Sequence, residues 1–387
     1  MKIAILGARN SHLSGGLYNS VRCLGLTLYH KGTDVEFFSF DDEYSEKDMY
    51  AYEDLPMVKY HRTSIPVLKQ YYYSSDLIGL LEKSNPDIIH SQAVWLYMSF
   101  ATRHFERSKK AKIIITPRGT LDPWALSTSR LKKGIVKFMV ENDNLRNADC
   151  IHALNLSEYK SIRAYGLRNP IAIIPNGINL PEDKKYDRGK EIKTLLFVGR
   201  INPKKGISEL LEALSIVQNQ RPELLWKWRV RIAGWDQQSH LAFLQNKCSD
   251  LGLGAYVSFI GPVLGKEKDE EHRKADAFVL TSYSEGLPMS VLEAWSYSLP
   301  IVMTEFCNLP DGFENNAAIR VTTSPESISK GLVQLFEMSD AERAEMGENG
   351  YRLVEREYTW DGIADKTLQL YHWLLNGGDK PSFVFLD

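Results

Sequence analysis

Short apolar runs alternate along this chain with stretches long enough for amphipathic helices, and this alternation limits the fold more than any other feature. Parallel strands that are covered by helices on both faces produce such a pattern. In the first half the expected strands are residues 2–7, 34–40, 87–92, 112–119, 150–155 and 171–177. In the second half they are residues 194–200, 228–235, 255–261, 277–282 and 300–305.

A strongly charged stretch, residues 181–193, interrupts this pattern before it restarts, and it reads as a linker. The sequence therefore predicts an α/β fold of two Rossmann-like, doubly wound domains, residues 1–180 and 181–359, with an interdomain cleft. A length of 387 residues agrees with two or three domains of about 150 residues each. Ligands bind such sheets at the carboxyl ends of the strands, so the functional residues are expected there.

The composition excludes several classes of protein. A formal net charge of −2 lacks the basic excess of a protein that binds nucleic acid. The four cysteines have neither disulfide-framework nor zinc-site spacing, which favours a reducing, cytoplasmic location. No signal-peptide pattern and no run of 18 apolar residues is present, so we expect neither export nor a membrane span. The oligomeric state is left open.

The densest group of candidate residues follows the strand at 277–282. A helix that begins near Pro288 presents unpaired N–H groups and a partial positive charge, which suits a diphosphate. Glu285 and Glu293 lie about two helical turns apart and are placed to hold sugar hydroxyls, although Glu293 also fits a plain surface position. The candidate donor-binding residues are Gly286, Leu287, Pro288, Met289 and Ser290.

Two further turns carry candidate ligand contacts. Arg200 and Lys205 follow the strand at 194–200 and together can neutralise a pyrophosphate without a metal, although a solvated basic loop is the alternative. Gly15 and Gly16 open the first helix and let a ligand approach the backbone, or they serve the turn alone. Neither a P-loop nor the G-x-G-x-x-G fingerprint is present, so a dehydrogenase is poorly supported.

Four polar residues lie at or beyond the ends of the strands at 87–92 and 112–119, where they are expected to face the cleft: His90, Gln92, Arg118 and Asp122. We favour Arg118 as a direct contact and take His90, Gln92 and Asp122 as candidates on the acceptor side, although a lone histidine such as His90 more often has a structural role. The chain has no D-x-D motif for a divalent metal. The acidic run at 267–273 more readily covers the wet face of a helix than binds a metal. A basic amphipathic helix over 129–139 either touches anionic lipid or is an ordinary surface helix.

Taken together, these segments resemble the retaining family-4 glycosyltransferases, which have the GT-B fold. The carriers of the resemblance are Gly15-Gly16, DIIHSQAVW, TPRGTLDPWAL, IPNGI, FVGRINPKKG and SEGLPMSVLEA with its E-x7-E. Many members of that family have histidines where this chain has Arg118 and Gln92. The TPRG form looks like a subgroup in which the contact to the transferred sugar or to the acceptor is changed.

The resemblance implies roles for the candidate residues. Arg200 and Lys205 would hold the diphosphate, Glu285 the sugar hydroxyls and Glu293 the ribose. The first domain would bind the acceptor, the second the donor, and a last helix, residues 360–376, would pack back on the first domain.

The implied activity is a metal-independent, retaining transfer from a UDP- or GDP-sugar to a saccharide or lipid-linked saccharide. The expected setting is the synthesis of bacterial surface polysaccharide, in the cytoplasm or peripherally at the inner face of the membrane. Two alternatives remain open, namely a nucleotide-sugar epimerase or hydrolase of the same fold, and a non-catalytic nucleotide-sugar-binding protein. No cofactor is expected.

Overall fold

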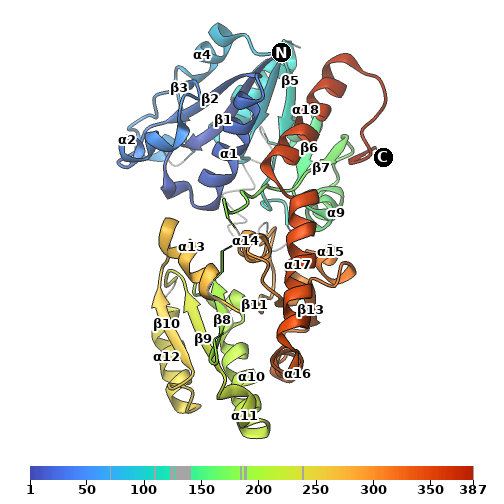
Figure 1. The fold of residues 1–387 in the computed structure, drawn as a ribbon. Helices are drawn as coiled ribbons and strands as arrows, with labels where there is room; N and C mark the ends of the chain where they lie inside the picture. The colour runs from blue at the N-terminus through green and yellow to red at the C-terminus, as the bar shows by residue number, and fades with distance from the viewer. Residues whose placement is uncertain are drawn as a thin grey trace. The chain divides into compact units, whose positions relative to one another are not determined.

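The computed structural model describes residues 1–386 except 70, 109, 123–125, 127–140, 184, 187–189 and 238. These residues form two compact units (Figure 1). Unit 1 comprises Met1–Gly177 and Trp360–Asp387, and unit 2 comprises Ile178–Thr359. The basic segment at 129–139 lies outside the described residues.

Unit 1 is built on an eight-stranded sheet with the order β14-β7-β6-β5-β4-β1-β2-β3, in which only the pairing of β14 with β7 is antiparallel. Its strands are β1 (Lys2–Arg9), β2 (Asp34–Phe40), β3 (Met57–Lys59), β4 (Ile88–Ser91), β5 (Lys112–Ile115), β6 (Cys150–Ala153), β7 (Ile171–Ile173) and β14 (Val384–Phe385). Its α-helices include α1 (Gly16–His30), α2 (Ser45–Asp48), α3 (Pro66–Lys69), α4 (Leu77–Ser84), α5 (Tyr97–Ser108), α8 (Asn142–Asn147), α9 (Leu156–Ala164) and α18 (Trp360–Asn376).

The side chains of β1 explain why this sheet is covered on both faces. Successive strand residues point to opposite faces. Accordingly, Ile3 and Ile5 are buried in one apolar cluster with side chains of α1 and α18, whereas Ala4 and Leu6 are buried in another with side chains of α4 and α5. The red helix α18 therefore belongs to unit 1, where it packs against the blue helix α1 (Figure 1).

Unit 2 contains a six-stranded, fully parallel sheet with the order β10-β9-β8-β11-β12-β13. Its strands are β8 (Lys193–Val198), β9 (Trp228–Ala233), β10 (Val257–Gly261), β11 (Ala277–Leu280), β12 (Ile301–Thr304) and β13 (Ala318–Val321). Its α-helices include α10 (Ile207–Gln220), α11 (Pro222–Leu225), α12 (His240–Asp250), α13 (Gly265–Lys274), α14 (Met289–Ser296), α15 (Pro310–Glu314), α16 (Pro325–Glu337) and α17 (Asp340–Glu357).

Apolar residues one helical turn apart attach these helices to the sheet of unit 2. Leu210 and Leu214 of α10 and Val291 and Trp295 of α14 are fully buried in one core cluster. The helix α17 begins with a capping box in which Ser339 and Glu342 each bond the other's backbone N–H, an arrangement that stabilises the start of a helix. Among the described residues, no helix has the length and apolarity needed to cross a membrane.

The prediction of two doubly wound α/β units is confirmed, but three strands were missed. β3, β13 and β14 have at most four residues each and lie at sheet edges. Such short runs do not show the repeated alternation of apolar and polar residues by which a strand is recognised. Several expected strands end earlier than predicted, so β5 stops at Ile115 and β11 at Leu280. The polar residues beyond those ends lie in loops, where they can meet a ligand.

Candidate functional site

The sheet order of unit 2 identifies the edge where a ligand is expected. From β8 the chain runs outward through β9 and β10, then returns to β11 beside β8 and continues through β12 and β13. β8 and β11 therefore flank a topological switch point, where open parallel sheets bind their ligands. Arg200 and Lys205 follow β8, and residues 281–290 follow β11. The structure thus brings the two predicted groups to one edge.

Lys205 and Glu285 form an ion pair across this switch point. The Lys205 Nζ atom lies 2.5 Å from Glu285 Oε1, and both side chains are nearly buried, at 12% and 13% exposure. Ser282 Oγ donates to the same carboxylate oxygen at 2.5 Å. Two donors thus hold one oxygen of Glu285, and this fixes the orientation of its carboxylate.

The loop that carries Glu285 is anchored on both sides. Toward β8, Thr281 Oγ1 donates to the Gly206 carbonyl at 2.8 Å, and the Tyr283 N–H donates to the Lys204 carbonyl at 2.9 Å. Toward β12, the Glu285 N–H donates to the Phe306 carbonyl at 2.9 Å. Gly206 has φ +67°, and a Cβ there would lie 2.1 Å from the Thr281 carbonyl oxygen, so the close approach of the two loops requires glycine.

The start of α14 presents donors to this edge. The N–H groups of Leu287, Met289 and Ser290 have no acceptor among the described residues. Pro288 is the N-cap residue and has no N–H to satisfy. Gly286 is exposed, and a Cβ there would meet no atom within 4 Å. The site therefore combines a helix N-terminus with open space for an anion.

Arg200 differs from Lys205 in having no side-chain partner among the described residues. It is exposed, and no ion pair or side-chain hydrogen bond is formed by it within the described part of the chain. Its guanidinium is therefore a cation without a described counter-ion at this edge. A ligand phosphate bound here would supply the missing bidentate acceptor.

Glu293 is paired with a lysine from the acidic run at 267–273, which the sequence interpretation assigned to the wet face of a helix. Lys268 Nζ lies 2.5 Å from Glu293 Oε1, with side-chain exposures of 31% and 23%. Glu293 is therefore not an unpartnered surface residue of α14. Its carboxylate is held between α14 and α13.

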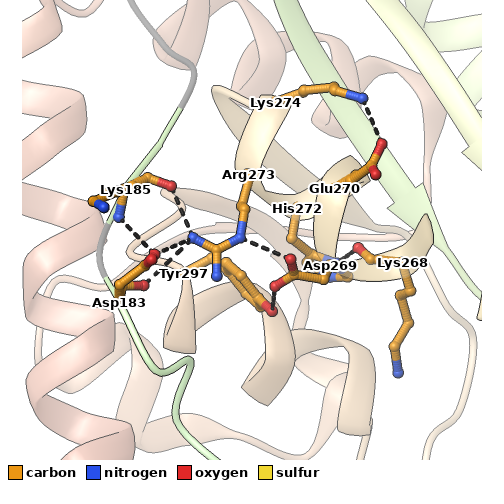
Figure 2. Close-up of polar contacts among 9 residues, drawn as sticks. All are labelled: Asp183, Lys185, Lys268, Asp269, Glu270, His272, Arg273, Lys274 and Tyr297. Atoms are coloured by element: carbon orange, nitrogen blue, oxygen red, sulfur yellow. Dashed lines mark hydrogen bonds and ion pairs between the residues drawn. The ribbon is translucent and has the colours of Figure 1, made fainter. Parts of the chain in front are cut away.

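The acidic run at 267–273 forms most of α13, and its contacts with the rest of unit 2 differ from those of a fully wet helix face (Figure 2). Arg273 donates to Asp183 Oδ1 at 2.6 Å and to Asp269 Oδ2 at 2.8 Å, while Tyr297 donates to the other oxygen of Asp269 at 2.5 Å. His272 is only 1% exposed and stacks on Tyr297, with ring centroids 5.0 Å apart. The described residues contain no cluster of His, Cys, Asp and Glu that could hold a metal.

In unit 1 the switch point lies between β1 and β4, because the chain runs outward from β1 to β3 and returns to β4. Arg118, which follows the neighbouring strand β5, reaches this point. Its Nη2 donates to Gln92 Oε1 at 2.5 Å, and its Nη1 donates to Asn176 Oδ1 at 2.8 Å and to Ser20 Oγ at 3.4 Å. Burial lowers the pKa of Arg118 to about 10, which the charge of Glu158 opposes.

The turn at Arg118 is conformationally unusual. Arg118 has φ +57° and Gly119 has φ +74°, and non-glycine residues rarely adopt such values. The Glu158 carboxylate holds the turn, since it accepts from the Gly119 N–H at 2.6 Å and from the Leu154 N–H at 2.8 Å. Glu158 is 8% exposed, and burial raises its pKa. Asp122 lies just beyond this turn, and its N–H donates to the Gly119 carbonyl at 3.3 Å.

His90 does not face a ligand, and its expected place on the acceptor side is corrected here. It lies within β4, is fully buried, and has both ring nitrogens engaged. His90 belongs to a chain of hydrogen bonds in which one arrangement of protons satisfies every group. Tyr371 O–H donates to His90 Nδ1 at 2.8 Å, and His90 Nε2–H donates to Thr116 Oγ1 at 2.8 Å. Thr116 O–H then donates to His152 Nδ1 at 3.1 Å, and His152 Nε2–H donates to the Ile174 carbonyl at 2.7 Å. Both histidines are neutral in this arrangement.

Gly15 and Gly16 stand at the start of α1, as expected. Gly15 has φ +59°, and a Cβ at either glycine would meet no atom within 4 Å. The N–H groups of Gly16 and Leu17 have no acceptor among the described residues. The turn therefore leaves open space and donors at the switch point of unit 1.

Two family models match adjacent halves of the chain. The model for Glycosyltransferase Family 4 matches residues 14–182, and the model for Glycosyl transferases group 1 matches residues 181–353. The chain belongs to the family-4 glycosyltransferases. Membership in the TPRG subgroup stays a prediction.

Similar proteins agree with this family and with the GT-B fold. A D-inositol 3-phosphate glycosyltransferase of Streptomyces avermitilis is 26% identical over 218 residues, which are 53% of this chain and 47% of that protein. The chain spans about half the length of the curated relatives it matches. Sucrose-phosphate synthase from Thermosynechococcus elongatus superposes with a TM-score of 0.75 at 18% identity, covering 98% of this chain and 100% of that one. The Anabaena protein HepE in complex with UDP-glucose gives 0.71 at 15% identity, with coverages of 96% and 99%.

Several polar residues at the two edges of this glycosyltransferase were missed in the sequence interpretation. Lys268 was read as part of a wet helix face, and its spacing from Glu293 carries no signal because the two residues lie on different helices. Ser282 and Thr281 were placed inside a strand, although their position before S-E-G-L-P indicates a loop. Asn176 lies within the IPNGI segment, for which the sequence predicted no contact. Only a three-dimensional contact identifies it as a partner of Arg118.

Proposed function

We propose that this chain transfers a sugar from a nucleoside diphosphate sugar, a UDP- or GDP-sugar, to a saccharide or lipid-linked saccharide, with retention of anomeric configuration. We assign donor binding to unit 2 and acceptor binding to unit 1. The carrying observation is the edge between β8 and β11, where exposed Arg200, the Lys205–Glu285 pair and the start of α14 meet. Family membership and the complex of HepE with UDP-glucose support this choice of donor.

The chemistry follows from where charge develops during transfer. When the glycosidic bond to the diphosphate breaks, negative charge accumulates on the leaving oxygen atoms. Arg200, Lys205 and the N–H groups at the start of α14 stabilise that charge without rearranging, because the loop is already anchored. These cations replace a divalent metal, for which the chain has no D-x-D motif.

Two carboxylates position the donor in this scheme. One oxygen of Glu285 is held by Lys205 and Ser282, and the other is available to accept hydroxyl groups of the transferred sugar. Glu293 accepts from the ribose hydroxyls. No residue of the site is assigned as an enzymic nucleophile, and the proposed course is front-face departure and attack through an oxocarbenium-like state.

A thermal-shift screen with UDP, GDP, ADP and their sugars tests the proposal. A ligand at 100 times its Kd raises the free energy of unfolding by about 2.7 kcal/mol. We expect one base to give a clear shift that Lys205→Gln abolishes and that a change at exposed Glu345 leaves intact. Incubating the preferred nucleotide sugar with and without acceptors then separates transfer from hydrolysis or epimerisation. Absence of any nucleotide shift would refute the proposal.

The biological setting is proposed from the family resemblance. Acceptors of surface polysaccharide synthesis are often lipid-linked, so the enzyme would work peripherally at the inner face of the bacterial membrane. Flotation with vesicles containing anionic lipid tests this part separately. An enzyme that stays unbound at low ionic strength would contradict it.

A further inference from the structure

The guanidinium of Arg118 has no counter-ion in the part of the chain that the structure describes. Among the described residues its hydrogen bonds go only to neutral oxygens, those of Gln92, Asn176 and Ser20. The described residues supply no ion-pair partner for it, and Glu158, the acid whose charge acts on it, already accepts from two backbone N–H groups. A half-buried cation without an anion is costly unless something else compensates it.

Two adjacent N–H donors are also unsatisfied. Arg118 Nε and Gln92 Nε2 are both buried, and no acceptor for either lies among the described residues. Gln92 is 0% exposed, and its oxygen is already used by Arg118. Native proteins leave few buried donors unpaired, and such groups call for a functional explanation.

The surroundings of Arg118 give a ligand access. The strained turn projects Arg118 beside Gly119, which is exposed and has open space where a Cβ would stand. Strain of this kind persists where the surrounding structure enforces it, commonly at functional sites. The contact with Ser20 places the guanidinium along the first turns of α1, whose initial N–H groups at Gly16 and Leu17 are unpaired among the described residues.

We propose that Arg118 and Gln92 form an oxyanion-binding site that receives an acidic group of a sugar substrate. The inference rests on the proposed function and narrows it, because the substrate that reaches unit 1 is then acidic. The oxyanion is either the carboxylate of a uronic acid or the phosphate of a phosphorylated sugar. Either group completes the bidentate pairing that the guanidinium lacks.

The first test gives the site an internal anion. Gln92→Glu places a carboxylate of the same shape beside Arg118. We expect a higher melting temperature than wild type at pH 7, together with loss of oxyanion binding. The matched variant Gln92→Met removes the polar group without adding charge and should not raise the melting temperature. A Gln92→Glu protein that melts lower than Gln92→Met, or that binds oxyanions as wild type does, would overturn the proposal.

The second test measures the oxyanion directly. In an Arg200→Gln/Lys205→Gln background, which removes the cations of unit 2, inorganic phosphate is titrated and followed by ³¹P NMR and thermal shift. We expect saturable binding that weakens at least tenfold with Arg118→Gln and less with Arg118→Lys. Arg168→Gln, which removes an exposed arginine of the same unit, should leave it unchanged. If phosphate does not bind, or binds equally well after Arg118 is replaced, the proposed oxyanion site is refuted.

A third comparison identifies the source of the oxyanion. In the same background, glucuronate and glucose 6-phosphate are compared with neutral glucose. Preference for glucuronate assigns a uronic acid, and preference for glucose 6-phosphate assigns a phosphorylated sugar. Equal binding of all three refutes both. Because nucleotide binding that depends on Lys205 is measured in the parent protein, failure of the proposed function and failure of this site give different results.

Discussion

The two switch points handle charge in opposite ways. At the edge of unit 2 the carboxylates have cationic partners, Lys205 for Glu285 and Lys268 for Glu293, and Arg200 is an exposed cation. At the edge of unit 1 the half-buried cation Arg118 donates to neutral oxygens, those of Gln92, Asn176 and Ser20. The first edge is held in place by its own ion pairs, whereas the second is left incomplete.

This difference has consequences for mutation. A ligand at the edge of unit 2 shares groups that already stabilise the loop, so removing one of them should affect turnover more than folding. In unit 1 a buried chain of hydrogen-bonded groups lies behind the edge and runs from Tyr371 through His90 to His152. Changing those groups should affect folding more than turnover. The predictions below test this division.

The largest effect is expected at the paired edge. Glu285→Gln removes the charge that orients Lys205 and weakens the acceptor for the sugar hydroxyls. We expect kcat/KM to fall at least a hundredfold, about 3 kcal/mol of transition-state stabilisation, while the fold is retained. Steady-state kinetics with the preferred nucleotide sugar, alongside circular dichroism, measures both. Glu345→Gln in α17 is the control, and a drop of less than threefold at Glu285 would remove it from the site.

The buried polar chain in unit 1 should make folding sensitive to acid. Burial lowers the pKa of His152 to about 4, and the pKa of His90 is also lowered by burial. The histidines of the unfolded chain take up protons near pH 6.5, whereas the buried histidines of the folded chain do so only at lower pH. The stability that the neutral histidines contribute is therefore fully present above pH 6.5 and is lost as the pH falls toward 4. For His152 alone the loss is on the order of 3 kcal/mol.

Denaturation from pH 7.5 to 4.5 measures this dependence. His152→Gln should start less stable at neutral pH and show a shallower decline, whereas His372→Gln, at an exposed position of α18, should keep the wild-type slope. Equal slopes for all three proteins would show that the neutral histidine chain does not govern acid stability.

The same contrast separates what the sequence could predict from what it could not. The alternation of apolar runs gave both sheets and placed Arg200, Lys205 and Glu285 at one edge, because residues after parallel strands share an edge. It also placed His90 and Gln92 near an edge. Two residues apart in the chain, they differ in that His90 lies inside β4 while Gln92 follows it.

The sequence could not predict which side chains form pairs with one another. No spacing rule connects Lys268 with Glu293, or Arg118 with Asn176, because each contact joins elements that only the folded chain brings together. The short strands β3, β13 and β14 were missed for a related reason. Whether such a segment forms a strand depends on the strand that it pairs with more than on its own residues.

A smaller effect is expected where the loops after β8 and β11 meet. Gly206→Ala combines an unfavourable φ with a clash against the Thr281 carbonyl, while Gly252→Ala has φ +69° in open space. The left-handed conformation alone costs roughly 1–2 kcal/mol for a non-glycine residue. Gly206→Ala should therefore lose more unfolding free energy than Gly252→Ala and should also weaken nucleotide binding. Equal losses in urea denaturation would show that the loops can separate without consequence.

The smallest effect tests whether pairing at unit 2 is needed for the ribose contact. Lys268→Gln leaves Glu293 in place but removes the cation that holds its Oε1 atom. Since the pair is partly exposed, its loss should cost about 1 kcal/mol or less, a several-fold rise in nucleotide Kd with kcat nearly unchanged. Calorimetry with the ribo- and 2′-deoxyribo-forms of the preferred nucleoside diphosphate sharpens this test. If Lys268 acts through Glu293, the ratio of the Kd for the 2′-deoxyribo-form to the Kd for the ribo-form is smaller in the variant than in the wild type. An unchanged ratio would mean that Glu293 binds the ribose hydroxyls without help from Lys268.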